Sequence, residues 1–516
     1  MKLLHTLWVK LTNRYVVAVI AGAILPLAFS PFDLHLLAFV SPAILYFLWR
    51  NATPKQAILI SYGFGLAYFG LGTSWVAVSM VKFGGVLLPV AAALTFLFVF
   101  ILASYIALAG FLLRRYFNSL SISVQAILVF PALWVITEWM RGWVFTGFPW
   151  IALGYSQTSG LLSGFIPVTG VFGISFLLCA SAGIIVLLAM SSRGAGRQKK
   201  TIIYTSALSA ILLSSLVLNY IPWVENDGDK IKVSLLQGNI PQDQKWKRKF
   251  KGLTIQRYLQ MTRENWDSDI VIWPETALPM YFHNARRLLS DLQDEAAQHN
   301  TSILLGLPVL DQSNSEIYYN SVVSLSDDFK LYHKNHLVPF GEFIPFKSLL
   351  GGLIQFMDVP MADFSRGGPN QELLRAAGYA IGISICYEDV FGEEVIRGLP
   401  EASLLVNVSN DAWFGDSLAP HQHLQMARFR ARESGRPMLR ATNNGISALV
   451  DSRGKILKVS KQFVITTITG DVQPMKGRTP YVIWGNYLVI GGSFLLLLFY
   501  FIRARWPWVS KKKATL

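Results

Sequence analysis

The sequence contains few charged residues for its length. Only 15% of the 516 residues are Asp, Glu, Lys or Arg, whereas 52% are hydrophobic and the mean hydropathy is +0.40. Soluble globular proteins carry about 25% charged residues, so this composition argues against an ordinary cytosolic enzyme. Cysteine is also scarce, with only Cys179 and Cys386 in the chain. A scaffold stapled by several disulfides is therefore excluded.

Acidic residues are nearly absent from the apolar parts of the chain. The formal net charge is +15, yet residues 221–481 hold 28 basic and 29 acidic side chains. The rest of the chain holds 18 basic residues against two acids, Asp33 and Glu138. A nucleic-acid-binding face would require basic residues clustered on the folded polar part. The surplus of positive charge instead flanks apolar segments, where it determines membrane topology.

Apolar runs of about 20 residues, the length that crosses a bilayer, occur eight times. The sequence therefore predicts a polytopic α-helical membrane domain with eight transmembrane helices. Seven of them lie in residues 1–221, and the eighth lies in residues 482–516 together with a basic tail, so that residues 222–481 form a separate polar domain. The expected spans are 15–31, 34–49, 56–80, 84–112, 121–141, 161–191, 201–221 and 482–502.

The short loops between these spans differ sharply in charge. One set holds 16 Lys and Arg residues, whereas the alternate set holds only Lys82 and Arg141. Because basic residues are retained in the cytoplasm, we expect a multi-pass protein of the inner (cytoplasmic) membrane with both termini cytoplasmic. Residues 222–481 then face outward, which is the periplasm in a Gram-negative cell. The first span also resembles a signal peptide, but removing it would reverse this charge pattern, so we expect it to be uncleaved.

One predicted span carries an ionisable pair. Glu138 and Arg141 are three residues apart in ITEWMRGWVFTGFPW, on one face of a helix. Ionisable residues within a membrane span usually have a function, and we interpret this pair as a site that binds a lipid headgroup. The alternative is an interfacial ion pair within a belt of Trp139, Trp143 and Trp150.

The polar domain alternates short β-branched or apolar runs with polar helical stretches. This texture predicts an α/β domain of about 250 residues. Candidate helices cover residues 249–265, 284–299 and 420–434. The candidate strands are IKVSLLQGN, SDIVIWPE, TSILLGLPV, YNSVVSLS, GYAIGISICYED, ASLLVNVS and GISALVDS.

Three segments place ionisable residues where an apolar run ends, which is where sites gather in α/β folds. IVIWPET presents Glu275, YHKNHLVPFGEFIP contains Lys334 and Glu342, and YAIGISICYEDVFG ends at Cys386. Each signal alone is modest, because such residues are more often turn, solvated or buried groups. Together they supply a thiol, a carboxylate to remove its proton and an ammonium to stabilise negative charge. Cys386 is also the sole cysteine of a domain expected to face an oxidising compartment. This favours a reactive nucleophile over a small buried hydrophobic residue.

These segments, WPE, then K-x-HLVPFGE, then CYE, resemble the nitrilase superfamily of carbon–nitrogen hydrolases. The longer strings and the eight spans resemble its apolipoprotein N-acyltransferase family, including GFPW, QGNIPQ and NVSNDAWFGDSLAPHQHLQMARFRARESGRPMLRATNNG. The resemblance implies a nitrilase-like α-β-β-α sandwich and assigns catalysis to Glu275, Lys334 and Cys386. It also implies support from Glu342, Glu388 and Tyr387, and a substrate-side role for Trp246.

The same resemblance implies the reaction. An acyl chain passes from a phospholipid, through a thioester on cysteine, to the α-amine of a diacylglyceryl-cysteine apolipoprotein. It implies no metal or organic cofactor, and the histidines of the domain lack a convincing third or fourth ligand. Those histidines are His333, His336, His421 and His423. One chain contains every group that the reaction needs, so we expect a monomer.

Two further segments have alternative interpretations. Residues 349–368 are apolar with Gly at both ends, and we interpret them as a membrane-dipping lid in which Phe356 and Met357 contact lipid; a buried helix with a loop is the alternative. The arginine-rich run after residue 423 indicates either phosphate binding or solvated faces and internal ion pairs. Its arginines are Arg428, Arg430, Arg432, Arg436 and Arg440.

Two other functional classes compete with the acyltransferase. A membrane-anchored amidase would use the same three groups but release its acyl-enzyme to water, and one anchor helix would suffice for it. A lipid transporter without catalysis would explain the helices but not the conjunction of Glu275, Lys334 and Cys386.

Overall fold

The computed structural model describes residues 14–191, 197–314, 316–326, 328–344 and 363–505. These residues form two compact units. The first unit contains Met1–Ser74, Ala92–Ile221 and Trp484–Leu516, and the second contains Trp75–Ala91 and Pro222–Ile483. Each unit is described separately below.

The first unit is built of apolar helices. Its main helices are α2 (Arg14–Ile24), α3 (Leu37–Arg50), α4 (Pro54–Gly72), α6 (Leu88–Tyr116), α8 (Phe130–Arg141), α9 (Ile166–Ser191), α10 (Arg197–Leu218) and α18 (Tyr487–Arg505). Glycine permits close packing between them. A Cβ at Gly22 would lie 2.1 Å from the backbone oxygen of Phe64, and one at Gly183 would lie 2.1 Å from that of Ala126. Small residues at such crossings let helix backbones approach within a membrane.

The prediction of several membrane helices is confirmed, whereas the count of eight is not. Among the described residues, five helices are long and apolar enough to cross a bilayer, or six if a bent pair forms one span. The five are Leu88–Tyr116, Ile122–Arg141, Ser163–Ser191, Gln198–Leu218 and Tyr487–Arg505. The helices Arg14–Ala28 and Leu37–Arg50 fall short of the length that a straight span requires.

The third predicted span, residues 56–80, is not continuous. Helix α4 ends at Gly72, and the chain bends by 51° before α5 (Val76–Lys82). Helix α5 belongs to the second unit, where Ser79 Oγ donates to the backbone oxygen of Trp413 at 2.7 Å. Trp75 Nε1 likewise donates to Gln422 Oε1 at 3.2 Å. These hydrogen bonds hold Trp75 and Ser79 in the second unit, and the hydropathy of the sequence does not reveal them.

The second unit contains two six-stranded sheets. The first has the order β13-β2-β3-β4-β5-β6 and the second has the order β12-β11-β10-β9-β8-β7. Strands β2, β3 and β4 are parallel to one another, as are β8, β9 and β10. The first sheet comprises β2 (Ile231–Gln237), β3 (Ile270–Ile272), β4 (Ser302–Leu310), β5 (Tyr318–Ser324), β6 (Leu331–His333) and β13 (Thr466–Val472). The second comprises β7 (Leu374–Ala376), β8 (Tyr379–Ile385), β9 (Leu404–Ser409), β10 (Met438–Thr442), β11 (Ala448–Val450) and β12 (Ile456–Val459).

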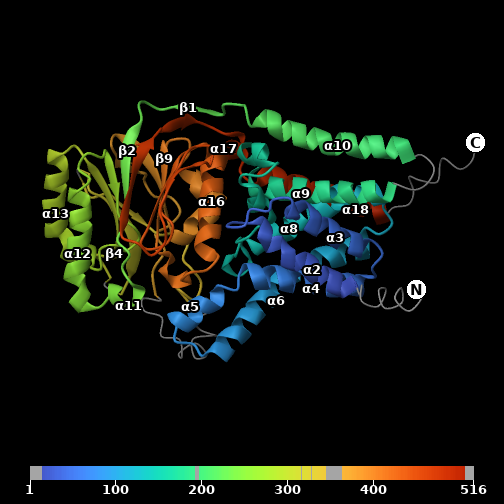
Figure 1. Cartoon of the computed structure of the whole chain (residues 1–516), viewed down its shortest axis with the longest axis horizontal. Helices are drawn as coiled ribbons and strands as arrows, with labels where there is room; N and C mark the ends of the chain where they lie inside the picture. Colours follow the sequence, from blue (N-terminus) through green and yellow to red (C-terminus); the bar gives the residue numbers. More distant parts are fainter. Residues whose placement is uncertain (1–13, 192–196, 315, 327, 345–362, 506–516) are drawn as a thin grey trace, which may run out of the picture. The chain divides into compact units, whose positions relative to one another are not determined.

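The two sheets pack face to face and helices cover their outer faces (Figure 1). Side chains such as Leu235 and Val406 fill the core between the sheets. Helices α12 (Arg248–Arg263) and α13 (Phe282–Gln298) cover the first sheet, and α16 (Ala419–Ser434) covers the second. The predicted α-β-β-α sandwich is therefore present. Because both sheet faces are covered, central strands such as β9 are mostly apolar and are buried along their whole length.

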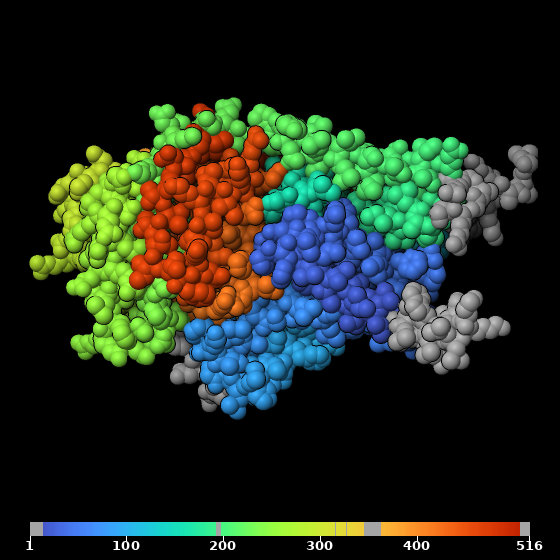
Figure 2. Space-filling model, in the orientation of Figure 1, coloured from blue at the N-terminus to red at the C-terminus, as the bar shows by residue number. Residues whose placement is uncertain are grey.

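Early and late parts of the chain are interleaved in this unit. Strand β13 pairs with β2 along seven residues, from Thr466 opposite Gln237 to Val472 opposite Ile231. The space-filling view accordingly shows green and red surfaces of the sandwich side by side (Figure 2). Residues far apart in sequence can thus contribute to one site at the sheet ends.

Candidate active site

Glu275 is fixed by the packing of the residues before it. Strand β3 is a fully buried Ile-Val-Ile run that leads directly into Trp273. The Trp273 ring stacks on Tyr258 with 5.0 Å between ring centroids, and its Nε1 donates to Thr262 Oγ1 at 2.9 Å. The chain then turns at Pro274 and places Glu275, which is only 6% exposed, at the sheet end.

The turn that carries Glu275 lies directly against Gly306 of strand β4. A Cβ at position 306 would lie 2.5 Å from the backbone oxygen of Pro274 and 2.8 Å from the Cα of Glu275. Real Cβ atoms do not approach backbone atoms this closely, so only glycine fits here. The position of the Glu275 carboxylate therefore depends on this glycine.

Lys334 follows strand β6 and is fully buried between two carboxylates. Its Nζ lies 2.8 Å from Glu342 Oε1 and 3.7 Å from Glu275 Oε1. Burial alone would lower the pKa of Lys334, but Glu342, Glu275 and Cys386 outweigh it and raise that pKa above its ordinary value. The Lys334 ammonium is therefore charged at neutral pH.

Asn320 of strand β5 joins the two carboxylates. Its Nδ2 donates to Glu275 Oε1 at 2.7 Å and to Glu342 Oε1 at 3.2 Å. Sequence reasoning missed this residue, because an asparagine inside the strand YNSVVSLS carries no signal of its own. Its backbone oxygen also accepts a hydrogen bond from the Lys334 N–H at 2.8 Å, so Asn320 fixes the register of the lysine segment as well.

Cys386 lies where strand β8 ends and the short helix η6 (Cys386–Val390) begins. Its φ is +52°, in the left-handed region that is unusual for a residue with a side chain. The side chain is 9% exposed. Burial and the Glu275 carboxylate raise the pKa of the Cys386 thiol well above its ordinary value, although Lys334 opposes them. At neutral pH the resting sulfur is therefore protonated.

The structure thus brings together the three side chains predicted to catalyse. Glu275 and Lys334 form a direct contact, and both act electrostatically on the Cys386 sulfur. The arrangement offers a proton acceptor, a fixed positive charge and a nucleophile in one buried place. Such a set suits covalent acyl transfer.

Glu388 supports the loops around this site. One or the other of its carboxylate oxygens accepts the backbone N–H of Ile385 at 2.7 Å, that of Asn335 at 2.6 Å and that of His336 at 3.1 Å. Tyr332 donates its hydroxyl to the same carboxylate at 3.2 Å. Burial raises the pKa of Glu388 to about 7 despite these hydrogen bonds. Glu388 therefore ties the Lys334 loop to the Cys386 loop.

Tyr387 and Trp246 differ in exposure. The Tyr387 side chain is buried and packs edge-on against Phe391, with 5.1 Å between ring centroids. Trp246 is 37% exposed and follows the short helix α11 (Gln242–Lys245). An exposed tryptophan beside the site suits contact with a substrate, whereas the Tyr387 ring is held within the domain.

Lys245, which immediately precedes Trp246, is a second buried lysine at the site. It is 2% exposed, and its Nζ donates to the backbone oxygen of Glu275 at 3.1 Å. Burial lowers the pKa of Lys245 to about 8, although Glu275 and Cys386 favour its charged form. The run KWKRKF reads as a solvated basic stretch, so its sequence gave no signal that one of these lysines is buried.

Glu138 and Arg141 form a buried pair in the first unit, with 3.9 Å between Oε1 and NH2. Glu138 accepts hydrogen bonds from Ser175 Oγ and the Leu153 N–H, and Arg141 donates to backbone oxygens of Phe148 and Trp150. These internal contacts make the pair part of the packing of the unit. The ion pair of the aromatic-belt interpretation is therefore present, whereas its interfacial position and headgroup binding by it both stay predictions.

Phe356 and Met357 lie outside the described residues, as does most of the predicted lid. Its described end, residues 363–368, forms backbone hydrogen bonds with the segment that contains Lys334 and Glu342. Phe364 N–H donates to the oxygen of Glu342 and Gly367 N–H donates to that of Lys334, each at 2.9 Å. This end of the predicted lid is therefore part of the folded domain.

Three of the five clustered arginines are buried, which contradicts the solvated alternative for them. Arg430 pairs with Glu433 at 3.0 Å, and Arg436 donates to backbone oxygens of Ala402, Pro400 and Gly477. Arg440 pairs with two aspartates described below. Internal ion pairs and carbonyl contacts thus occupy these guanidinium groups, and the structure gives no support to phosphate binding by them.

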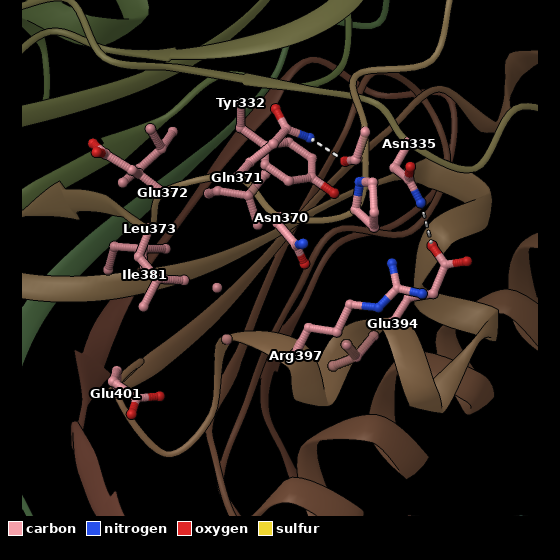
Figure 3. A pocket seen from close by; sticks show the side chains of 17 residues that line it. Tyr332, Asn335, Asn370, Gln371, Glu372, Leu373, Ile381, Glu394, Arg397 and Glu401 are labelled. Carbon is pink, nitrogen blue, oxygen red and sulfur yellow. Dashed lines mark hydrogen bonds between the residues drawn. The ribbon is translucent and has the colours of Figure 1, made fainter.

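A cavity of about 440 Å³ adjoins the Lys334 loop (Figure 3). Its wall includes Tyr332 and Asn335, which also contact Glu388. Asn335 Nδ2 donates to Glu394 Oε2 at 3.3 Å along the same wall, near Arg397. The cavity therefore shares its polar lining with the network that supports the site.

Comparison with known proteins decides the family. Residues 21–184 match the model of the apolipoprotein N-acyltransferase N-terminal domain, and residues 232–481 match that of carbon-nitrogen hydrolase. An apolipoprotein N-acyltransferase of Methylococcus capsulatus is 47% identical over 92% of this chain and 93% of its own length. The chain belongs to the apolipoprotein N-acyltransferase family. A Coxiella burnetii member is 39% identical, over 94% of this chain and 99% of its own length. One from Nitrosomonas europaea is 40% identical over 94% and 96%.

The resemblance drawn from the three motif segments is therefore confirmed. As a member of this N-acyltransferase family, the chain is an acyltransferase of the inner membrane with a nitrilase-like domain in its C-terminal half. Neither the anchored amidase nor the lipid transporter accounts for both family matches.

Proposed function

We propose that the protein transfers an acyl chain from a phospholipid to the α-amine of the diacylglyceryl-cysteine that begins an apolipoprotein. The acyl chain is carried as a thioester on Cys386, in a ping-pong cycle that completes lipoprotein maturation. The observation that carries this proposal is the buried contact of Glu275 with Lys334 beside the Cys386 thiol, in a chain of this family.

In the first half-reaction, Glu275 acts as general base. Because the resting sulfur is protonated, its proton passes to Glu275 as the sulfur bonds to the ester carbonyl carbon of the phospholipid. The tetrahedral intermediate then expels the glycerol oxygen, which takes the proton back from Glu275. Lysophospholipid leaves, and the acyl chain remains on Cys386 as a thioester.

Lys334 stabilises the charge that develops in this step. Its ammonium is fully buried, so it opposes negative charge with little screening by water. We assign the oxyanion to Lys334 together with the backbone N–H of Tyr387. Glu342, at 2.8 Å from the Lys334 Nζ, and Asn320 hold the ammonium and Glu275 in register.

In the second half-reaction, the uncharged α-amine of the apolipoprotein attacks the thioester carbonyl. Glu275 accepts the proton that the nitrogen gives up and returns it to the departing sulfur, which restores the thiol. The burial of Glu275, Lys334 and Cys386 supports this route, because a thioester shielded from water is not hydrolysed before the amine binds.

The same proposal includes the arrangement in the membrane. Residues 1–221 and 482–516 form the membrane domain with both termini in the cytoplasm, and residues 222–481 form the periplasmic catalytic domain. The charge of the short loops supports this orientation. One chain supplies every catalytic group, so we propose that it acts as a monomer on two membrane-anchored substrates.

Mass spectrometry of the protein incubated with phospholipid alone tests the proposal. We expect a Cys386 peptide heavier by one acyl chain, with release of lysophospholipid and no adduct in Cys386→Ser. Addition of a diacylglyceryl-cysteine peptide should discharge the adduct and yield the N-acyl peptide. Steady release of free fatty acid without the peptide would identify a hydrolase that releases its acyl-enzyme to water, and absence of any adduct would refute the mechanism.

A further inference from the structure

Four buried charged side chains surround the backbone of Cys386, and the reaction above uses none of them. Asp389 comes from η6, Asp411 from η8 (Asp411–Phe414), His423 from α16 and Arg440 from β10. Each is 2% exposed or less. Buried charges are costly unless they are paired and hydrogen-bonded, so their pairing indicates what the cluster does.

The four side chains form a closed ring of opposite charges. His423 lies between the two aspartates, with Nδ1 at 3.1 Å from Asp411 Oδ1 and Nε2 at 2.8 Å from Asp389 Oδ1. Arg440 reaches the other oxygens of the same carboxylates, at 3.0 Å for Asp411 and 3.3 Å for Asp389. Two potential cations thus face two anions.

This geometry determines the protonation of His423. Both ring nitrogens face carboxylate oxygens, which only accept hydrogen bonds, so a neutral ring would direct a lone pair at an anion. The ring of charges is also balanced only when His423 is an imidazolium. Burial and Arg440 lower the pKa of His423, but Asp389 and Asp411 outweigh them and raise it above its ordinary value.

The cluster is connected to the backbone of Cys386 at two points. The Cys386 carbonyl oxygen lies 3.3 Å from His423 Nε2, which also faces Asp389, and it accepts a hydrogen bond from Asn407 Nδ2 at 3.2 Å. Asn407 is oriented in turn by Arg440, which donates to its Oδ1. The left-handed backbone of Cys386 is therefore held from outside its own loop.

A further connection leads to the sulfur. Ser409 Oγ donates its one proton to Asp411 Oδ1 at 3.0 Å, and the same hydroxyl is hydrogen-bonded to the side chain of Cys386. Asp411 therefore acts on the ring of His423 from one oxygen and on the serine beside the sulfur as well. The cluster contacts Cys386 through its carbonyl and, by way of Ser409, through its side chain.

We propose that His423, held as an imidazolium between Asp389 and Asp411, is a positioning residue that fixes the Cys386 carbonyl and thereby aims the sulfur. The inference rests on the proposed role of Cys386 as the nucleophile. The position of the sulfur is important because the reaction slows sharply when a reacting atom is displaced from its productive position. The charged groups that face the ring are Asp389, Asp411 and Arg440, each from a different element.

The first test replaces His423 with Gln, which removes the positive charge and one donor. We expect the rate of Cys386 acylation by phospholipid to fall about tenfold or more, the scale of one lost charge-assisted hydrogen bond, at an unchanged half-saturating phospholipid concentration. Alkylation of Cys386 by iodoacetamide, followed by peptide mass spectrometry, should fall in parallel. His421→Gln, on the same helix, is the matched control and should react like wild type.

Alkylation needs no lipid, so it separates the two proposals. If wild-type Cys386 is alkylated but never acylated, the proposed function fails, whereas slower alkylation in His423→Gln still supports the positioning role of His423. Wild-type rates of both reactions in folded His423→Gln would overturn the inference.

Asp411→Asn is the second variant, and it remains informative if His423→Gln does not fold. It preserves the shape and an acceptor for Arg440 but removes one anion from the imidazolium. We expect the pH above which acylation declines to shift downward relative to wild type, because His423 then loses its proton more easily. An unchanged pH for this decline would contradict an imidazolium role.

Discussion

The side-chain amide of Asn320 donates a hydrogen bond of 2.7 Å to Oε1 of Glu275. This contact comes from the strand next to β4, whereas Glu275 follows β3, so it links two strands of one sheet at the site. The same Nδ2 lies 3.2 Å from Glu342 Oε1. One amide therefore orients both carboxylates that flank Lys334.

Replacement of Asn320 by Ala should slow the formation of the acyl-enzyme. Hydrogen bonds to charged groups contribute about 1.5–3 kcal/mol, so we expect a loss of roughly ten- to a hundredfold in the rate of thioester formation. The rate is measured by mass spectrometry of the Cys386 peptide after mixing with phospholipid. Asn314→Ala, at an exposed position on the surface, is the control. Equal rates for Asn320→Ala and wild type would show that thioester formation does not depend on the orientation of Glu275 by this amide.

A second prediction concerns the glycine beside Glu275. Gly306→Ala would place a Cβ 2.5 Å from the backbone oxygen of Pro274, so the Glu275 turn must shift. We expect destabilisation of about 1–3 kcal/mol and a drop in acylation larger than this loss of stability explains. Gly252→Ala in α12 is the control, because no atom lies within 4 Å of its added Cβ. The measurements are thermal unfolding and acylation at a temperature where both variants are folded.

Sequence reasoning located the domain helices well, and it singled out three side chains that the structure places together. The predicted helix 249–265 corresponds to Arg248–Arg263, and 284–299 corresponds to Phe282–Gln298, because amphipathic periodicity and turn residues are local signals. Glu275, Lys334 and Cys386 could be predicted as a catalytic set because strand ends are recognisable from local sequence and the chemistry of the three groups is complementary.

Residues whose role depends on burial could not be found in this way. Lys245 belongs to a basic run, and only packing against the Glu275 segment buries it. Arg440 pairs with Asp389, 51 positions away in the chain, so no local pattern distinguishes it from a solvated arginine. The break between α4 and α5 was missed for the same reason, since the contacts of Trp75 and Ser79 with residues near 413–422 are not local.

The buried Lys245 gives a prediction about pH. Its pKa is about 8, so it is charged below pH 8 and loses its charge as the pH rises further. A positive charge near Cys386 favours the thiolate, so wild type should be alkylated by iodoacetamide faster than Lys245→Met at pH 6–7. The ratio of the two rates should approach one as the pH rises through about 8. Lys247→Met, at the exposed neighbouring lysine, should leave the pH profile as in wild type. A constant ratio from pH 6 to 10 would rule out this electrostatic role.

The raised pKa of Glu388 gives a prediction about how the stability of the protein depends on pH. Burial raises its pKa to about 7 from the ordinary 4.5, so the folded protein retains a proton that the unfolded chain releases above pH 4.5. The contribution of this group to stability is therefore fully present below pH 4.5 and is lost as the pH rises through about 7.

Glu388→Gln is neutral throughout, and its amide also meets backbone N–H groups that need an acceptor. We expect the variant to be less stable than wild type, with the larger deficit in unfolding temperature at pH 5 than at pH 7.5. Glu264→Gln, at an exposed position, should show no such change of deficit with pH, and a deficit for Glu388→Gln that grows toward pH 7.5 would contradict the raised pKa.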